Sequence, residues 1–453
     1  MYLERFTAPV LAHYSYLIAD EDRAVVIDPR RDVGAYLETA AERGLRITDI
    51  YETHRHEDFV VGSIELAEAT GARLHHADDE LDYAYGAAVE DGELLRFGRY
   101  ELEALATPGH TPGSFSYLLR DVSGEPWIVF TGDTLFAGDL GRVDLPGVER
   151  MEEMAGLLWD SLRERLLPLG DHVIVAPAHG PGSVCGTAIA ERPWTTIGLE
   201  RRLNPNLRLD SKAAFIETVA VEHERPPYFR MMEHYNLVGA PSVATAPLPP
   251  QLDPAEFAAR LDDCRLLDTR DVGAYAAAHT PGALSIWRDG LASFAGWLLD
   301  YEHPLLLVTQ DVDPTPELTL LRRLGYDDIA GCLAGGMTAW QMAGRPTESV
   351  ETLTVQDLCG RLDEGRRPAI LDVRSAAELE NRGRIAGARH LHLTRLPEHL
   401  DEFAADDEPL VFCGSGLRSM VAASLLQRAG VRRPRVVLGG LSAWNSTTCP
   451  VEL

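Results

Sequence analysis

The chain has 453 residues and a formal net charge of −28 at pH 7. This length exceeds what one hydrophobic core organises and predicts about three domains. The acidic charge argues against nucleic acid as a partner, because phosphate binding needs a basic face. The N-terminus has no apolar signal core and no run reaches the ~20 residues of a membrane span, so we expect a cytoplasmic protein without a membrane partner. Six cysteines show no close-spaced pattern, which favours free thiols in a reducing compartment.

Strands and helices alternate from the start of the chain. Residues 23–28 and 47–52 are short β-branched runs that predict strands. Residues 33–43 have apolar side chains at helical spacing and end at Gly44, which predicts a helix with a glycine C-cap. The second strand runs into the cluster Thr-His-Arg-His-Glu-Asp-Phe at residues 53–59. The cluster therefore lies on a loop that leaves a strand, where an α/β scaffold presents ligands.

Three more loops follow strand-like runs. They carry His110 in Thr-Pro-Gly-His-Thr, Asp133 in Thr-Gly-Asp-Thr and His179 in Ala-Pro-Ala-His-Gly. Any one of these histidines alone is typical of a surface or core residue, but four such loops in one segment favour a metal site. In this order the loops resemble the metallo-β-lactamase superfamily over residues 1–240. The resemblance implies an αββα sandwich.

Residue 59 departs from the pattern of the dinuclear hydrolases in this superfamily. In those enzymes the first metal takes the positions of His54, His56 and His110, Asp133 bridges, and the second metal takes those of Asp58, the next residue and His179. Here the next residue is Phe59, which donates no lone pair, so a second ion would bind weakly. A single ion held by two imidazoles and one carboxylate is typical of non-haem Fe(II) enzymes that bind O₂. Spacing does not determine which imidazole is left out.

Residues 135–145, Leu-Phe-Ala-Gly-Asp-Leu-Gly-Arg-Val-Asp-Leu, resemble the persulfide dioxygenase branch of the superfamily. This resemblance implies one Fe(II) per chain, bound by His54, His110 and Asp133, with His56 close by and not a ligand. Because the first-metal set is complete, a Zn²⁺ site stays open as the alternative.

Further residues are candidates for the same pocket. His56, Asp58 and His179 are candidate additional metal-pocket residues. Arg142 is a candidate contact for an anionic substrate. Cys185 lies six residues after His179 and is a candidate sulfur-carrying thiol, with a small residue packed under a turn as an equal alternative.

A Pro- and Ala-rich linker near residues 239–254 precedes an internal repeat. Leu-Asp-Thr-Arg at 267–270 recurs as Leu-Asp-Val-Arg at 371–374, and a Gly-Gly motif at 335–340 recurs at 439–444. The offset of 104 residues indicates two copies of one small domain. Alternating apolar strands and amphipathic helices predict a parallel sheet covered on both faces. Both copies, at residues 253–346 and 353–453, resemble the rhodanese family, which implies doubly wound α/β domains.

Only the second copy carries a cysteine at the end of its central strand. Residues 409–412 predict a buried strand and residues 419–429 a helix. Between them lies the candidate anion-binding loop, with Cys413 and Arg418 as candidate catalytic residues around Gly414, Ser415, Gly416 and Leu417. Peptide N–H groups and a helix N-terminus in such a loop stabilise a thiolate and an anionic sulfur donor. A buried structural cysteine is the alternative.

The loop length distinguishes two uses of this architecture. Four residues lie between Cys413 and Arg418, whereas a cysteine-dependent phosphatase of similar architecture has five. The shorter loop favours sulfane sulfur over phosphate. The first copy has no cysteine in the matching residues 304–314 and has gained carboxylates and prolines, so we expect it to be structural.

The two resemblances together imply one function. The chain would oxidise a low-molecular-weight thiol persulfide with O₂ to sulfite and transfer sulfane sulfur through Cys413 to give thiosulfate, as in sulfide detoxification. A zinc hydrolase similar to glyoxalase II with accessory rhodanese domains is the main alternative, and a non-enzymatic sulfide sensor is another. Residues 204–236 are apolar and aromatic enough to pack on a second copy of the chain or to close the first domain, so a homo-oligomer stays open.

Overall fold

The computed structural model describes residues 1–8, 10–78, 81–186, 188–192, 194–243, 246–444 and 446–452. The chain divides into two compact units. The first comprises residues 1–246 with 322–325, and the second comprises residues 247–321 with 326–453. Within the described ranges, no helix is both long enough and apolar enough to cross a membrane.

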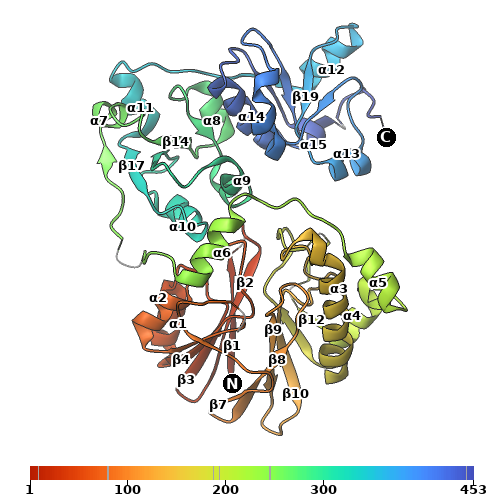
Figure 1. Ribbon diagram of the computed structural model, residues 1–453. Helices are drawn as coiled ribbons and strands as arrows, with labels where there is room; N and C mark the ends of the chain where they lie inside the picture. Colours follow the sequence, from red (N-terminus) through yellow and green to blue (C-terminus); the bar gives the residue numbers. More distant parts are fainter. Residues whose placement is uncertain are drawn as a thin grey trace. The chain divides into compact units, whose positions relative to one another are not determined.

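The described residues of the first unit include two six-stranded sheets (Figure 1). In spatial order the first sheet contains β1 (Tyr2–Ala8), β2 (His13–Asp20), β3 (Arg23–Ile27), β4 (Arg46–Tyr51), β5 (Arg73–His76) and β6 (Ala87–Ala88). The second contains β12 (Thr195–Thr196), β11 (Ile174–Pro177), β10 (Pro126–Gly132), β9 (Phe115–Arg120), β8 (Tyr100–Ala106) and β7 (Leu94–Phe97). Strands β3 to β6 pair in parallel, and β7 to β10 pair antiparallel.

Helices cover the outer face of each sheet (Figure 1). On the first sheet these are α1 (Gly34–Arg43) and α2 (Ser63–Thr70), and on the second they are α3 (Met151–Asp160), α4 (Ile197–Leu203) and α5 (Lys212–Val219). The first unit also contains helix α6 (Phe229–Val238) and short 3₁₀ or π segments at Val148–Arg150, Ser161–Leu166, Leu167–Leu169 and Asn206–Arg208. Along strand β2, successive side chains point to opposite faces of the sheet. Tyr16 and Ile18 pack between the sheets, whereas Leu17 and Ala19 pack toward the helices. This arrangement confirms the predicted αββα sandwich.

Two parallel five-stranded sheets form the described part of the second unit. The first copy contains β13 (Gln251–Leu252), β17 (Ile329–Leu333), β16 (Leu305–Val308), β14 (Arg265–Asp268) and β15 (Leu284–Ser285). The second contains, in the same spatial order, β18 (Glu351–Thr354), β22 (Arg435–Leu438), β21 (Leu410–Phe412), β19 (Ile370–Asp372) and β20 (Arg389–His390). The shared strand order confirms that the repeat consists of two copies of one domain.

Short helices connect these strands. In the first copy they are α7 (Pro254–Ala258), α8 (Val272–Ala277), α9 (Leu291–Leu298), α10 (Thr315–Arg323) and α11 (Gly336–Met342), with a turn at Arg288–Gly290. In the second copy they are α12 (Val355–Asp363), α13 (Ala376–Arg382), α14 (Leu417–Arg428) and α15 (Gly440–Trp444), with a 3₁₀ segment at Leu393–Glu402.

The two copies share a hydrophobic core. Met420 and Ala423 of α14 lie in one buried cluster with Leu266 and Leu306 of the first copy. Helix α14 also contacts β15, where the peptide N–H of Ser285 donates to Ser424 Oγ at 3.1 Å. The first copy therefore covers one face of the helix that follows Cys413.

The expectation of free thiols is wrong for one pair of cysteines. Cys359 on α12 and Cys449 form a disulfide, with Cα atoms 5.7 Å apart and 90 residues between them in sequence. Sequence spacing does not reveal this pair, because only the fold brings the C-terminal segment to α12. The other described cysteines, Cys185, Cys264, Cys332 and Cys413, are free.

Candidate metal centre and cysteine loop

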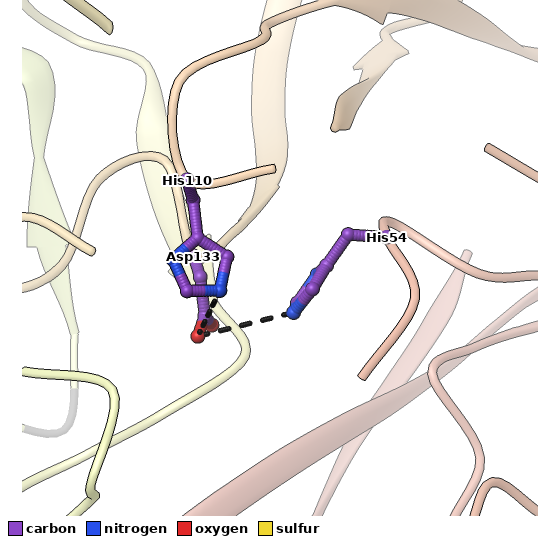
Figure 2. Close-up of side chains that lie close together, drawn as sticks. All are labelled: His54, His110 and Asp133. Atoms are coloured by element: carbon purple, nitrogen blue, oxygen red, sulfur yellow. Dashed lines mark ion pairs between the residues drawn. The ribbon is translucent and has the colours of Figure 1, made fainter. Parts of the chain in front are cut away.

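Three ligand side chains from three strand ends meet in the first unit (Figure 2). His54 follows β4, His110 follows β8 and Asp133 directly follows β10. His54 Nε2 lies 3.9 Å and His110 Nε2 lies 3.4 Å from Asp133 Oδ2. All three side chains are buried. These are the residues that the resemblance assigns as ligands.

Hydrogen bonds fix the tautomers of both imidazoles. His110 Nδ1 donates to the carbonyl oxygen of Arg142 at 2.8 Å, so Nε2 carries a lone pair. Thr53 Oγ1 donates to Asp28 at 2.8 Å and therefore accepts from His54 Nδ1 at 2.9 Å. The Nε2 atom of His54 keeps its lone pair as well. No sequence motif marks Asp28 or Thr53 as functional, because an ordinary strand end and a common hydroxyl carry no ligand motif.

The charge states of the three residues suit a cation. Burial lowers the pKa of His54 and of His110, so both are neutral ligands. Burial opposes ionisation of Asp133, yet the neighbouring His179 holds the pKa of Asp133 well below the usual range of a carboxyl group. Asp133 Oδ2 has no hydrogen-bond partner among the described residues. Three lone pairs that face one another without a proton between them fit a bound metal ion.

His56 lies outside this group of three. Its Nε2 is 3.1 Å from Asp28 Oδ1, and this carboxylate raises the pKa of His56 against the effect of burial. Phe59 is fully buried and packs on His56, with ring centroids 4.6 Å apart. It also packs on His13 at 4.1 Å. His13 could not be found from the sequence, because a lone histidine at the start of a strand forms no motif.

Asp58, His179 and Cys185 form a second buried group, whose ligand atoms lie within 4.8 Å of one another. His179 donates from Nδ1 to Asp133 Oδ1 at 2.8 Å and from Nε2 to Asp58 Oδ2 at 2.9 Å. Burial disfavours the charged form of His179, but the carboxylates of Asp133 and Asp58 hold the pKa of His179 well above its usual range. The ring is therefore an imidazolium. Burial, together with the same carboxylates, raises the pKa of Cys185 well above its usual range and keeps the thiol protonated.

Helix α6 holds the ligand loop in place. Asn236 donates from Nδ2 to the carbonyl oxygens of His56 at 2.7 Å and Phe59 at 2.8 Å. Its Oδ1 accepts from the peptide N–H of Val61 at 3.0 Å. The role of Asn236 could not be found from the sequence, because its partners are backbone atoms about 180 residues away. The segment 204–236 thus contributes a helix that closes the first domain.

Arg142 is buried and already paired. Its guanidinium donates to Asp144 at 2.6 and 2.7 Å and to the carbonyl oxygens of His223 at 3.0 Å and Glu224 at 3.3 Å. With Cys185 and His223 it lines a cavity of about 290 Å³. An anion in this cavity would therefore meet a guanidinium that a carboxylate neutralises.

Cys413 directly follows β21 in the second unit and is fully buried. The peptide N–H of Gly416, the residue before α14, donates to Cys413 Sγ at 3.1 Å. The peptide N–H groups of Leu441 and Ser442 donate to the carbonyl oxygens of Cys413 and Gly414 at 2.9 and 2.8 Å. The N–H groups of α15 thus bind carbonyl oxygens of the cysteine loop, and the N–H of Gly416 in the same loop points at the sulfur.

Arg418 lies beside this loop in a paired state. It donates to both carboxylate oxygens of Glu378 at 2.6 Å. Burial opposes ionisation of Glu378, but Arg418 and the backbone N–H of Ser375 lower its pKa to about 2. Burial and the charge of Arg418 lower the pKa of His392 to about 4. Glu378 was not among the predicted site residues, although the Ser-Ala-Ala-Glu capping box at 375–378 is a sequence signal for it.

The matching loop of the first copy has a different chemistry. Thr309 follows β16 in the place that Cys413 takes after β21. Arg288 pairs with Asp311 and Glu317, both at 2.7 Å. The described part of this loop offers a hydroxyl and carboxylates and no thiol.

Comparison with known proteins extends these observations. The model of the metallo-beta-lactamase superfamily matches residues 8–179, and that of the rhodanese-like domain matches residues 253–343 and 354–447. The mitochondrial persulfide dioxygenase ETHE1 of Homo sapiens is 33% identical over 222 residues, which cover 46% of this chain and 76% of that protein. A hydroxyacylglutathione hydrolase of Polaromonas sp. is 34% identical over 239 residues, which cover 47% of this chain and 87% of that protein. The crystal structure of a metallo-beta-lactamase from Staphylococcus aureus subsp. aureus COL is 30% identical, with a TM-score of 0.66, and covers 74% of this chain and 98% of that one.

These similarities, together with the sandwich and its ligand loops, show that the chain belongs to the metallo-β-lactamase superfamily. It is a fusion in which two rhodanese-like domains follow the metallo-β-lactamase domain. Its relatives include persulfide dioxygenases and hydroxyacylglutathione hydrolases.

Proposed function

We propose that residues 1–240 form a non-haem Fe(II) persulfide dioxygenase, residues 253–346 a structural copy and residues 353–453 a sulfurtransferase. The observation that carries the proposal is the donor set of two imidazoles and one carboxylate. His56, the residue that would complete a hydrolase-type first site, lies instead against Asp28. Such a set with open positions is typical of Fe(II) enzymes that use O₂. The similarity to ETHE1 supports the same choice.

The residues of the first domain have distinct roles in this proposal. Fe(II) held by His54, His110 and Asp133 would supply open positions for the persulfide sulfur and for O₂. The Arg142 carbonyl and Thr53 hold both imidazoles in the tautomer that presents Nε2. His179 orients Asp133 through Oδ1, so that Oδ2, which has no hydrogen-bond partner among the described residues, would hold the ion. The net reaction converts a persulfide, O₂ and water into a thiol and sulfite.

The second domain would transfer sulfane sulfur. The Cys413 thiolate attacks the terminal sulfur of a second persulfide, forms a Cys413 persulfide and releases the carrier thiol. Sulfite then attacks that outer sulfur, thiosulfate leaves and the Cys413 thiolate returns. The N–H of Gly416 and the guanidinium of Arg418, with the remaining loop residues, stabilise these anions. Transfer from thiosulfate to a thiol is the same chemistry in reverse.

A zinc hydrolase is the second candidate function. Hydroxyacylglutathione hydrolases are as similar to the first domain as persulfide dioxygenases are. Asp58 and His179, which match ligands of the second metal in dinuclear hydrolases, are both present and buried. Such an enzyme would use a metal-bound hydroxide as the nucleophile.

Metal analysis with oxygen consumption separates the two functions. The full chain is purified without oxygen, its iron and zinc are measured, and glutathione persulfide is added in an oxygen electrode. We expect about one iron per chain and O₂ uptake with sulfite release. Zinc without O₂ uptake, together with hydrolysis of a glutathione thioester, would reject the dioxygenase.

A further inference from the structure

The disulfide of the second rhodanese-like copy has a carboxylate beside it. Asp363 Oδ2 lies 3.9 Å from Cys359 Sγ, and its Oδ1 lies 3.7 Å from Cys449 Sγ. One ligand atom of each of these three residues lies within 4.8 Å of the other two. The sulfurs of a disulfide carry no proton to donate. While the disulfide is closed, the exposed carboxylate of Asp363 therefore has no donor and no cation among the described residues.

Both sides of this group are held in place without the sulfur–sulfur bond. Cys359 and Asp363 are four residues apart on α12 and so lie on one face of the helix, whose start a capping box fixes. Cys449 follows a turn in which Thr447 Oγ1 donates to the carbonyl oxygen of Trp444 at 2.7 Å and accepts from the N–H of Cys449 at 3.3 Å. Both cysteines pack in one buried cluster with Trp444. Opening the disulfide would therefore leave two neighbouring thiols beside the carboxylate.

We propose that Cys359, Cys449 and Asp363 form a cation site when the disulfide is reduced, suited to a borderline divalent ion such as Zn²⁺. Two thiolates and a carboxylate are ligands that Zn²⁺ takes in tetrahedral geometry, with the fourth position open to water. Bond lengths of about 2.3 Å to sulfur and about 2.1 Å to oxygen place such a sulfur and oxygen about 3.6 Å apart, close to the two distances observed here. The two sulfur ligands disfavour hard ions such as Mg²⁺ and Ca²⁺.

A thiol supplies the electrons that open the site. Two molecules of a low-molecular-weight thiol donate two electrons and two protons, the sulfur–sulfur bond breaks, both cysteines become thiols, and the donors leave as their own disulfide. Zn²⁺ then takes both sulfurs as thiolates and releases the two protons. Oxidation reverses these steps and expels the ion. In a reducing compartment, the ion would hold the C-terminal segment to α12 in place of the disulfide.

The site belongs to the second copy alone and lies outside both proposed reaction centres. Counted from the helix cap, Ala258 of the first copy takes the place of Cys359. Counted from the Gly-Gly motif, Arg345 takes the place of Cys449. The group shares no residue with the metal centre of the first unit or with the Cys413 loop. The inference therefore holds whichever reactions those two centres perform.

Cobalt binding compares the two redox states of the same full-length protein. Metal-free protein is divided into an oxidised portion and a portion reduced with a phosphine, which is removed before anaerobic titration with Co²⁺. Cysteine ligands produce a thiolate-to-cobalt charge-transfer band in the near ultraviolet. We expect the reduced portion to bind one more Co²⁺ per chain than the oxidised portion and to gain this band, and we expect Zn²⁺ to displace that ion. The free thiols, Cys185 among them, are present in both portions and cannot produce the difference.

Four variants identify the ligands. Cys359→Ser and Cys449→Ser should each remove the extra ion and the band, whereas Cys264→Ser, a matched change at a free thiol, should keep both. Asp363→Asn changes an exposed position and keeps the disulfide, so its oxidised form stays folded. Its reduced form should bind the ion at least about tenfold more weakly, because a direct ligand disappears. Equal cobalt binding in the two redox states, a band that persists in Cys359→Ser, or unchanged affinity in Asp363→Asn would overturn the proposal.

Discussion

His56 and His110 are both fully buried imidazoles, but only His110 faces Asp133. His56 lies instead against Asp28 and Phe59. We expect His110→Ala to lose bound iron by at least about tenfold in affinity, because a direct ligand disappears. His56→Ala should retain iron within about threefold. Iron per chain after anaerobic reconstitution measures the difference, and equal loss in both variants would contradict the three-residue site.

Cys413 separates the two proposed reactions. We expect Cys413→Ser to abolish thiosulfate formation, because the acceptor of sulfane sulfur is gone. Sulfite release and O₂ uptake from glutathione persulfide should remain within about twofold of the unaltered protein. Cys264→Ser, a change at another free thiol, is the matched control and should leave both products unchanged. Loss of O₂ uptake in Cys413→Ser would show that this domain feeds the metal centre.

Glu378 makes the stability of the second copy depend on pH. Its pKa falls from 4.5 to about 2 on folding, chiefly because Arg418 outweighs the effect of burial. The folded state therefore gains stability above about pH 4.5, and this gain disappears as the pH falls toward 2. We expect Glu378→Gln to lower the thermal midpoint at pH 7 and to have a much smaller effect near pH 3. A difference that does not change with pH would contradict the ion pair as its source.

The functional residues that lie in motifs can be predicted from the sequence. The residues that position them by hydrogen bonds cannot. His54, His110, Asp133 and Cys413 stand in loops whose residue types point to chemistry. Their supports are ordinary residues: Thr53 fixes a tautomer and Asn236 binds backbone atoms. Such roles depend on tertiary contacts that no local pattern encodes. Which imidazole lies outside the site likewise depends on where Asp28 sits after folding.

Helix α6 acts on the metal loop through one side chain. Asn236→Ala would leave the carbonyl oxygens of His56 and Phe59 and the N–H of Val61 without their partner. We expect unfolding of the first domain to become easier by about 2–4 kcal/mol, because unpaired buried polar groups are costly. Chemical denaturation followed by iron release measures this. The control His234→Ala changes an exposed residue of the same helix and should shift stability by no more than about 0.5 kcal/mol.

Elements with strong local signals were predicted closely. Helix α1 ends at Arg43 before Gly44, which has the left-handed φ of 66° that a glycine C-cap adopts. Strands β3, β4 and β21 lie on the predicted apolar runs.

The Cys359–Cys449 disulfide constrains most of the second rhodanese-like copy. It closes a loop across a sequence separation of 90 residues. The chain-entropy effect of such a loop predicts that Cys359→Ser lowers stability by about 2–4 kcal/mol under oxidising conditions. Urea denaturation with and without reductant measures this. With reductant the variant and the unaltered protein should match, and a difference that persists would assign the effect to packing of the side chain instead.

The shared core of the two copies limits how the second copy can be separated from the first. Met420 and Ala423, in the first two turns of the helix that follows Cys413, pack in a cluster with residues of the first copy, in which Thr309 takes the place of that cysteine. Truncating the chain to residues 353–453 would bare that apolar surface and favour aggregation. The first copy therefore covers an apolar face of α14, and a second copy expressed alone would first require polar substitutions on that face.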